Sequence, residues 1–129
     1  MSHSLGMKFL ELTRNQVRAS MPVNKHTVQP MRILHGGASV ALAETLMSVG
    51  AWLNLDDDTK TAVGIEINAN HLRPVPEGDL VYGTAIPLHR GAGTQVWETK
   101  ITAENGKLVC ISRCTVAVVS GANISGTGM

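Results

Sequence analysis

The sequence predicts an α+β fold in which one long helix is surrounded by an antiparallel sheet. A proline-free run rich in good helix formers covers residues 36–53 and predicts the helix. Four runs typical of strands follow it, and Asn105-Gly106 between the last two is a strong signal for a hairpin. Short turns between such strands favour antiparallel pairing, with the helix packed on one face of the sheet.

The predicted strands are separated by turn-forming residues. They cover residues 7–13, 16–23, 61–72, 80–88, 94–103 and 107–119. Arg14-Asn15 forms the expected turn between the first two strands. The segment 24–34 contains a Gln-Pro step at Pro30, which disfavours a helix, so we expect an irregular connection before the long helix.

Apolar side chains are spread around the whole circumference of the predicted helix. They are Ala38, Val40, Ala41, Leu42, Leu46, Met47, Val49, Ala51 and Trp52. A helix that is apolar on all sides is normally buried. A long buried helix inside a curved antiparallel sheet is the hotdog arrangement, and the sequence predicts that fold.

The size and composition of the chain are those of one globular domain. The chain has 129 residues, so we expect a single domain over residues 1–129. Apolar residues make up 43% and charged residues 16%, which is enough apolar material to bury a core. Residues 120–129 are small and polar, and we expect them to form a fraying tail.

Charge and hydropathy argue against several classes of partner. The net charge is +1 with Lys and Arg scattered, whereas a nucleic-acid-binding chain normally carries a basic stripe. The longest candidate for a membrane span, residues 36–55, is interrupted by Glu44. The first residues lack the regions of a signal peptide, so we expect a cytoplasmic protein with no membrane partner.

The two cysteines do not form a disulfide or a metal site in this interpretation. Cys110 and Cys114 lie four residues apart in a predicted strand, roughly 13 Å apart on one face, which is too far to bridge. No further Cys or His accompanies them at zinc spacing. We therefore expect two structural thiols, no metal and no cofactor.

Glu44 is the one charged side chain of the predicted helix. It is the only ionisable residue between His35 and Asp56, and no cation lies three or four positions away. Burying an unpaired carboxylate is costly, so such a group is a candidate for catalysis. The alternative is that Glu44 reaches solvent on a narrow stripe with Gly37 and Ser48.

His35-Gly36-Gly37 precedes this helix directly. Two glycines allow a ligand to approach the backbone, and the first-turn N–H groups carry partial positive charge that suits an oxyanion. The same segment is compatible with an ordinary turn before a helix and a surface histidine. A carboxylate eight residues later favours acyl-transfer chemistry, because that chemistry needs both groups.

The length of the helix predicts how these two groups cooperate. Eight residues of helix rise about 12 Å, and the lean of side chains recovers about a third of that distance. Glu44 and the Gly36 N–H of one chain therefore cannot act on the same carbonyl carbon. If both act on one thioester, they come from different subunits, and we expect a dimer with shared active sites.

The motifs around these residues resemble those of the PaaI-like hotdog thioesterases. The matching segments are Gln29-Pro30, residues 33–45, residues 63–73, Pro87-Leu88-His89, Gln95-Val96-Trp97 and Ser112-Arg113. The segment 63–73, VGIEINANHLR, resembles most the branch that hydrolyses 1,4-dihydroxy-2-naphthoyl-CoA or proofreads enterobactin synthesis. The resemblance covers roughly residues 5–119 and implies a thioester hydrolase.

The resemblance also implies roles for the residues that match the family motifs. Glu44 matches the carboxylate that attacks the thioester or activates water, and Gly36 matches the amide that polarises its carbonyl. Gln29 and His35 match residues that position the thioester. Ser48 matches a residue near the acyl group and the attacking water.

The remaining matches concern the two ends of the substrate. His71 matches a residue that lines the acyl pocket. Arg73 and the loop His89-Arg90-Gly91 match positions where family members meet the nucleotide of CoA. The resemblance implies an acyl- or aroyl-CoA substrate, with an acyl carrier protein thioester as a further option, and a tetramer built from two dimers.

Two other functions fit a hotdog domain. One is a hydratase or dehydratase of acyl thioesters that uses His35 and Glu44 as acid and base, and the other is a non-catalytic acyl-CoA-binding module. Relatives usually carry a helical segment before the first strand, whereas here that strand follows Leu5-Gly6 closely. We therefore expect a less covered acyl pocket, and the acyl group stays open.

Overall fold

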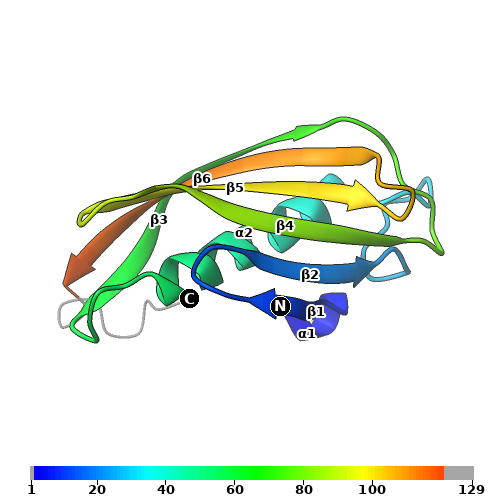
Figure 1. Cartoon of the computed structure of the whole chain (residues 1–129). Coiled ribbons are helices and arrows are strands. Elements are labelled where there is room, and N and C mark those ends of the chain that lie inside the picture. The colour runs from blue at the N-terminus through cyan, green and yellow to red at the C-terminus, as the bar shows by residue number, and fades with distance from the viewer. Residues whose placement is uncertain (1, 121–129) are drawn as a thin grey trace.

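The computed structural model describes residues 2–120 and shows one long helix held against a six-stranded antiparallel sheet (Figure 1). The elements are α1 (Ser2–Leu5), β1 (Lys8–Leu12), β2 (Val17–Pro22), α2 (Gly36–Leu53), β3 (Lys60–His71), β4 (Leu80–Arg90), β5 (Thr94–Ala103) and β6 (Leu108–Ser120). The predicted α+β hotdog fold is confirmed, and the long helix and all six predicted strands are present. Apart from Ser120, the predicted tail lies outside the described residues.

The strands follow the order β1-β2-β4-β5-β6-β3 across the sheet, and each neighbouring pair is antiparallel. Asn105-Gly106 connects β5 to β6 as predicted, with Gly106 at a φ of 84°. β3 lies at one edge, where it pairs with β6 along one side. Its other side is an unpaired edge within the described chain, which is a surface that a second strand can join.

The core lies between the concave face of the sheet and one side of α2. The sheet contributes Val17, Ala19, Met21, Val81, Ala85, Trp97 and Ile101, and the helix contributes Leu42, Ala43, Leu46 and Met47. Gly50 lets the helix lie directly on Trp97, because a Cβ at that position would be 2.5 Å from the indole ring. The close contact fixes the helix relative to the sheet.

Both ends of α2 are capped by side chains. His35 is the N-cap residue, and its Nδ1 accepts a hydrogen bond of 2.7 Å from the Gly37 N–H. At the other end the Asn54 side-chain amide donates to the Gly50 carbonyl at 2.9 Å. These bonds satisfy backbone groups that an isolated helix end leaves without partners.

The prediction that α2 is buried on all sides is wrong for a single chain. We call the uncovered side the open face of α2; it comprises Gly37, Val40, Ala41, Glu44, Ser48 and Trp52. Trp52 is 46% exposed, and Glu44 is exposed as well. The chain's own sheet covers only one side of the helix. In a single chain Glu44 therefore lies on a solvent-exposed stripe, which is the alternative that the sequence left open.

The short helix α1 was not predicted. It precedes β1, and Leu5 packs against the core. Four residues give no amphipathic period, so their helical state depends on contacts that the sequence pattern does not contain.

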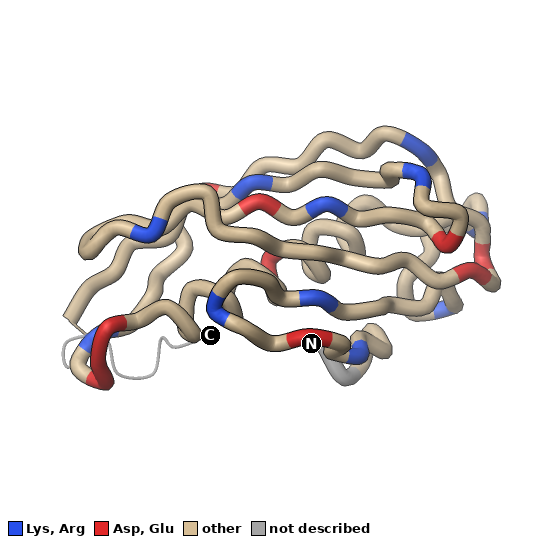
Figure 2. Tube along the Cα trace, viewed as in Figure 1, with Lys and Arg blue, Asp and Glu red and all other residues tan. Residues whose placement is uncertain are grey.

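Charged residues of both signs are spread along the trace (Figure 2). Asp56, Asp57 and Asp58 are exposed in the loop after α2, as predicted. Among the described residues, no helix is long and apolar enough to cross a membrane.

Candidate active site

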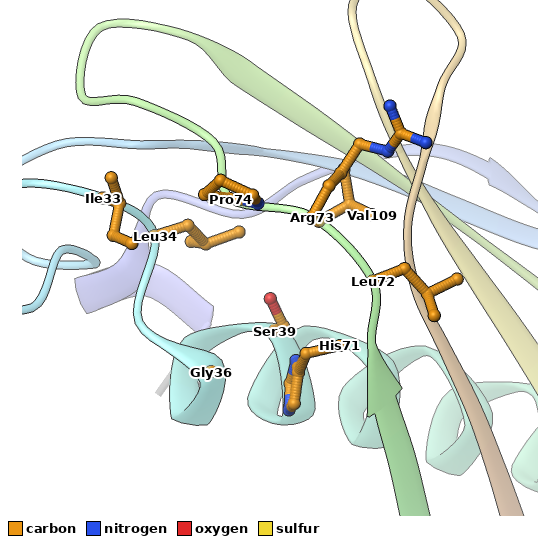
Figure 3. A pocket seen from close by; sticks show the side chains of 9 residues that line it. All are labelled: Ile33, Leu34, Gly36, Ser39, His71, Leu72, Arg73, Pro74 and Val109. Carbon is orange, nitrogen blue, oxygen red and sulfur yellow. The ribbon is translucent and has the colours of Figure 1, made fainter.

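The first turns of α2 line a cavity of about 310 Å³ that contains three of the predicted site residues (Figure 3). Gly36 and Ser39 come from the helix, His71 from the end of β3, and Arg73 from the segment after it. In Figure 3 the His71 imidazole lies over the helix, and the Arg73 side chain points away from it. A Cβ on Gly36 would be 3.2 Å from His71 Nε2, so the glycine lets the ring lie close to the backbone.

The Gly36 N–H is available to a ligand. The N–H groups of Gly37 and Ala38 donate to Nδ1 and the carbonyl oxygen of His35, whereas the Gly36 N–H donates to no group among the described residues. It lies at the positive end of the helix dipole, where a developing negative charge is stabilised. The arrangement therefore provides one free donor for a carbonyl oxygen.

Gln29 lies in a tightly turned loop before the helix. Its side-chain oxygen accepts a hydrogen bond from the Met31 N–H, and its backbone N–H donates to Ile33 at 2.9 Å. Arg32 has a φ of 64° and donates two bonds, of 2.8 and 2.6 Å, to the Glu77 carboxylate. The ion pair ties the loop to the segment between β3 and β4, and the Met31 N–H holds the side-chain oxygen of Gln29.

Glu44 lines a separate cavity of about 160 Å³. The other walls are residues 64–67 of β3 and Cys114 of β6. Burial, followed by the negative charges of Glu44 and Glu66, raises the pKa of Cys114 to about 11. Cys110 and Cys114 are both buried and form no disulfide, as predicted, and Cys114 stays protonated at neutral pH.

The two cavities share no residue in a single chain. One is lined by His71 at the end of β3, and the other by residues 64–67 in the middle of that strand, four to seven residues away, which is roughly 13–23 Å along an extended strand. The Gly36 N–H and the Glu44 carboxylate therefore face different cavities, as the length of the helix predicts. Ser48 lies one turn after Glu44 on the open face of α2 and is partly buried.

The predicted nucleotide-binding residues do not come together in one chain. Across the sheet Arg90 of β4 pairs with Gln95 of β5, and Gln95 pairs with Val116 of β6. Val116 pairs in turn with Gly64 of β3, so Arg90 lies level with Gly64. Arg73 follows the opposite, His71 end of that strand. His89 and Gly91 adjoin Arg90, so a single chain places this loop and Arg73 at opposite ends of the sheet.

Arg90 also has a structural role. Its guanidinium donates three hydrogen bonds, to the Arg14 carbonyl at 3.1 Å, to Asn15 Oδ1 at 2.9 Å and to Asn54 Oδ1 at 3.1 Å. These bonds join the β1–β2 turn to the end of α2, where a positive charge interacts favourably with the helix dipole.

We expect Arg90→Met to lower the free energy of unfolding by about 1–2 kcal/mol, since it removes charge-assisted hydrogen bonds. Urea titration followed by circular dichroism measures the loss. Arg113→Met is the matched control, because its ion pair with Glu98 is exposed on the Arg113 side and long at 3.9 Å. An equal effect of both substitutions would contradict the structural role of Arg90.

No group of three or more His, Cys, Asp or Glu in the described part of the chain is placed to hold a metal ion.

Comparisons with known proteins show the class of proteins to which the chain belongs. The chain belongs to the thioesterase superfamily, whose family model matches residues 31–110. It is 45% identical over 115 residues to the 1,4-dihydroxy-2-naphthoyl-CoA hydrolase of Escherichia coli, covering 89% of this chain and 83% of that protein.

Solved structures agree in fold. A thioesterase from Haemophilus influenzae has a TM-score of 0.86 at 44% identity, with 92% of this chain and 82% of that chain covered. A mutant thioesterase from Pseudomonas aeruginosa has a TM-score of 0.87 at 42% identity, with 92% and 85% covered. The predicted family membership is confirmed, and the protein is an enzyme that hydrolyses thioesters.

Sequence reasoning did not identify three features near the site. Glu66 and Cys114 share the cavity of Glu44, and the Arg32–Glu77 ion pair holds the Gln29 loop. Each of these features depends on contacts between residues that are far apart in sequence, and a local sequence pattern does not predict such contacts. The bulge between Gly64 and Glu66 also shifts the register of β3, so the residues of β3 that face the Glu44 cavity do not follow a simple alternation.

Proposed function

We propose that the protein hydrolyses an aroyl- or acyl-CoA, with the Gly36 N–H and Glu44 of two subunits acting on one thioester. The observation that carries this proposal is the division of the site within one chain. A free N–H donor faces one cavity and a carboxylate faces another, and neither cavity contains both groups.

The edge strand β3 offers a way to bring the two halves together. Antiparallel pairing of β3 with the same strand of a second copy, centred near Ile67 and Asn68, sets His71 of one chain beside Gly64 of the other. The cavity with Gly36 then adjoins the cavity with Glu44 of the second copy. The same pairing brings Arg73 to the end of the partner's sheet that carries the loop 89–91.

The two reacting groups are the Gly36 N–H of one cavity and the Glu44 carboxylate of the other. The Gly36 N–H stabilises the negative charge that develops on the carbonyl oxygen, while Gln29 and His35 position the thioester. Glu44 either removes a proton from a water that attacks the carbonyl carbon or attacks that carbon itself. The C–S bond then breaks, the CoA thiolate takes up a proton, and the acid is released, after hydrolysis of the anhydride in the second case.

The relatives support the proposed substrate class. The chain is 45% identical to a protein named for its action on 1,4-dihydroxy-2-naphthoyl-CoA, which favours an aromatic acyl group with hydroxyl substituents. A carrier-protein thioester uses the same reacting atoms and is the alternative. A dimer or a tetramer in the cytoplasm, with no resident cofactor, is part of the proposal.

Replacing Gly36 with proline tests the role of the N–H group. Proline is well tolerated at the first position of a helix, and the preceding residue, His35, already has the extended ψ of 132° that proline requires. We expect Gly36→Pro to lower kcat by a hundredfold or more, since it removes one oxyanion donor. Release of free thiol from a panel of CoA esters measures the rate.

Gly36→Ala is the matched control, because it introduces the same 3.2 Å contact with His71 but keeps the N–H. The proposal expects Gly36→Ala to retain most of the activity that Gly36→Pro loses. Equal losses in the two variants would assign the effect to the contact and would remove the N–H from the mechanism.

A further inference from the structure

The side chain of Ser39 is a buried polar group without a partner. Ser39 is 2% exposed and lines the cavity that contains Gly36 and His71. Its backbone N–H donates to the His35 carbonyl at 3.3 Å, but its hydroxyl makes no hydrogen bond within residues 2–120. Leaving a buried hydroxyl without a hydrogen bond is costly, so such a group in a folded protein needs a physical reason.

The same helix shows how a hydroxyl in this setting is normally satisfied. The Thr45 hydroxyl donates to the carbonyl of Ala41, four residues earlier, at 2.7 Å. Ser and Thr commonly make this bond in the interior of a helix. The corresponding acceptor for Ser39 is the His35 carbonyl, which accepts the backbone N–H groups of Ala38 and Ser39 but not the hydroxyl. The Ser39 hydroxyl is therefore free for a partner outside the helix.

The hydroxyl points into the cavity, on the same side of α2 as Gly36. Ser39 follows Gly36 by three residues, a spacing that puts two positions on one face of a helix. In Figure 3 its oxygen points from the helix toward Leu34 and Pro74, which are apolar walls of the cavity. A hydrogen bond made between such walls is strengthened because water is excluded.

We propose that the Ser39 hydroxyl binds the substrate by a hydrogen bond about one helical turn from the thioester carbonyl. The inference rests on the proposed thioester hydrolysis, in which the Gly36 N–H holds the carbonyl oxygen. One turn of helix separates Gly36 from Ser39, which is a distance of about 5 Å. A hydroxyl both donates and accepts, so it pairs with an N–H, O–H or C=O group of the substrate at that distance.

Two parts of an acyl-CoA carry such a group close to the thioester. One is the first amide of the pantetheine arm, and the other is a polar substituent on the acyl group. A bond to the amide adds affinity for every CoA ester, whereas a bond to the substituent selects the acyl groups that carry it. In both cases Ser39 contributes to binding, and the C–S bond is broken by the action of Gly36 and Glu44.

Removing the hydroxyl tests the proposal. In a Glu44→Ala background, which separates binding from turnover, isothermal titration calorimetry compares CoA, benzoyl-CoA, 3-hydroxybenzoyl-CoA and 4-hydroxybenzoyl-CoA. We expect Ser39→Ala to weaken binding roughly threefold to tenfold, the usual effect of losing one neutral hydrogen bond. An equal loss for CoA and all esters would place the bond on the pantetheine amide. A loss confined to a hydroxylated ester would place it on the acyl group.

Thr45→Val is the matched control, because it removes a hydroxyl of the same helix that is already bonded to Ala41. Its affinities are expected to equal those of the background. Ser39→Cys is a second variant of similar size with a weaker hydrogen-bonding group, and we expect affinities between those of serine and alanine.

The stability of the ligand-free protein separates binding from a structural role. Since the Ser39 hydroxyl has no partner in the chain, Ser39→Ala is expected to keep or raise the urea midpoint of unfolding. A lowered midpoint would assign the hydroxyl to the fold and overturn the proposal, and so would unchanged affinity for CoA and every ester. Failure of the wild type to hydrolyse any thioester would instead contradict the proposed function, which the binding test does not measure.

Discussion

Replacing Glu44 with alanine is expected to lower the rate of thiol release by a hundredfold or more while the affinity for CoA esters is retained. Glu44 is exposed on the open face of α2 and lines its cavity with backbone and side chains of β3. Among the described residues it makes no salt bridge, so its removal costs the fold little. The loss of rate reports its chemical role, because no other group is assigned to water activation or attack.

Glu98→Gln is the control for loss of a carboxylate. Glu98 lies on β5, pairs with Arg113 at 3.9 Å and lines neither the Glu44 cavity nor the Gly36 cavity. The activity of the Glu98→Gln variant is expected to match that of the wild type. Equal rates in Glu44→Ala and the wild type would remove Glu44 from the mechanism.

Replacing Trp97 with alanine is expected to lower the free energy of unfolding by about 3–5 kcal/mol, the usual effect of truncating a buried aromatic residue. Trp97 is completely buried, and its Nε1 donates a bond of 2.8 Å to Gln95 Oε1. Gln95 donates in turn to the Ala51 carbonyl at 3.4 Å. The substitution therefore leaves a cavity under Gly50 and an unpaired acceptor in the core.

Urea unfolding followed by far-UV circular dichroism measures this loss. Trp97→Phe keeps an aromatic ring but removes the N–H, so we expect an intermediate loss of about 1–3 kcal/mol. An alanine variant as stable as the wild type would contradict the account of how α2 is fixed on the sheet. The position of α2 on the sheet matters for the active site, since α2 carries both Gly36 and Glu44.

The elements that the sequence predicted are those with a local signal. The helix over residues 36–53 has a proline-free interior rich in good helix formers, and the hairpin at Asn105-Gly106 has the turn residues that it requires. Gly36 and Glu44 were found as candidates for the same reason. One is a glycine at a helix start, and the other is a lone charge in an apolar helix.

Features that depend on contacts between distant segments could not be predicted. The exposure of Glu44 depends on which side of α2 the sheet covers, and an apolar circumference does not reveal that side. The three bonds of Arg90 join the β1–β2 turn and the end of α2, which are far apart in sequence. The cavity that Leu5 lines together with Gly37 and Ala41 depends in the same way on the packing of α1.

Mixed dimers of Glu44→Ala and Gly36→Pro chains test most directly that each active site combines two subunits. The two chains are co-expressed with different tags, purified over both, and assayed for thiol release from an aroyl-CoA. Each mixed dimer then has one site with an intact Gly36 N–H and an intact Glu44, so we expect about half of the wild-type rate. If both groups instead acted from one chain, the mixed dimer would be as inactive as either parent, and that result would contradict the shared site.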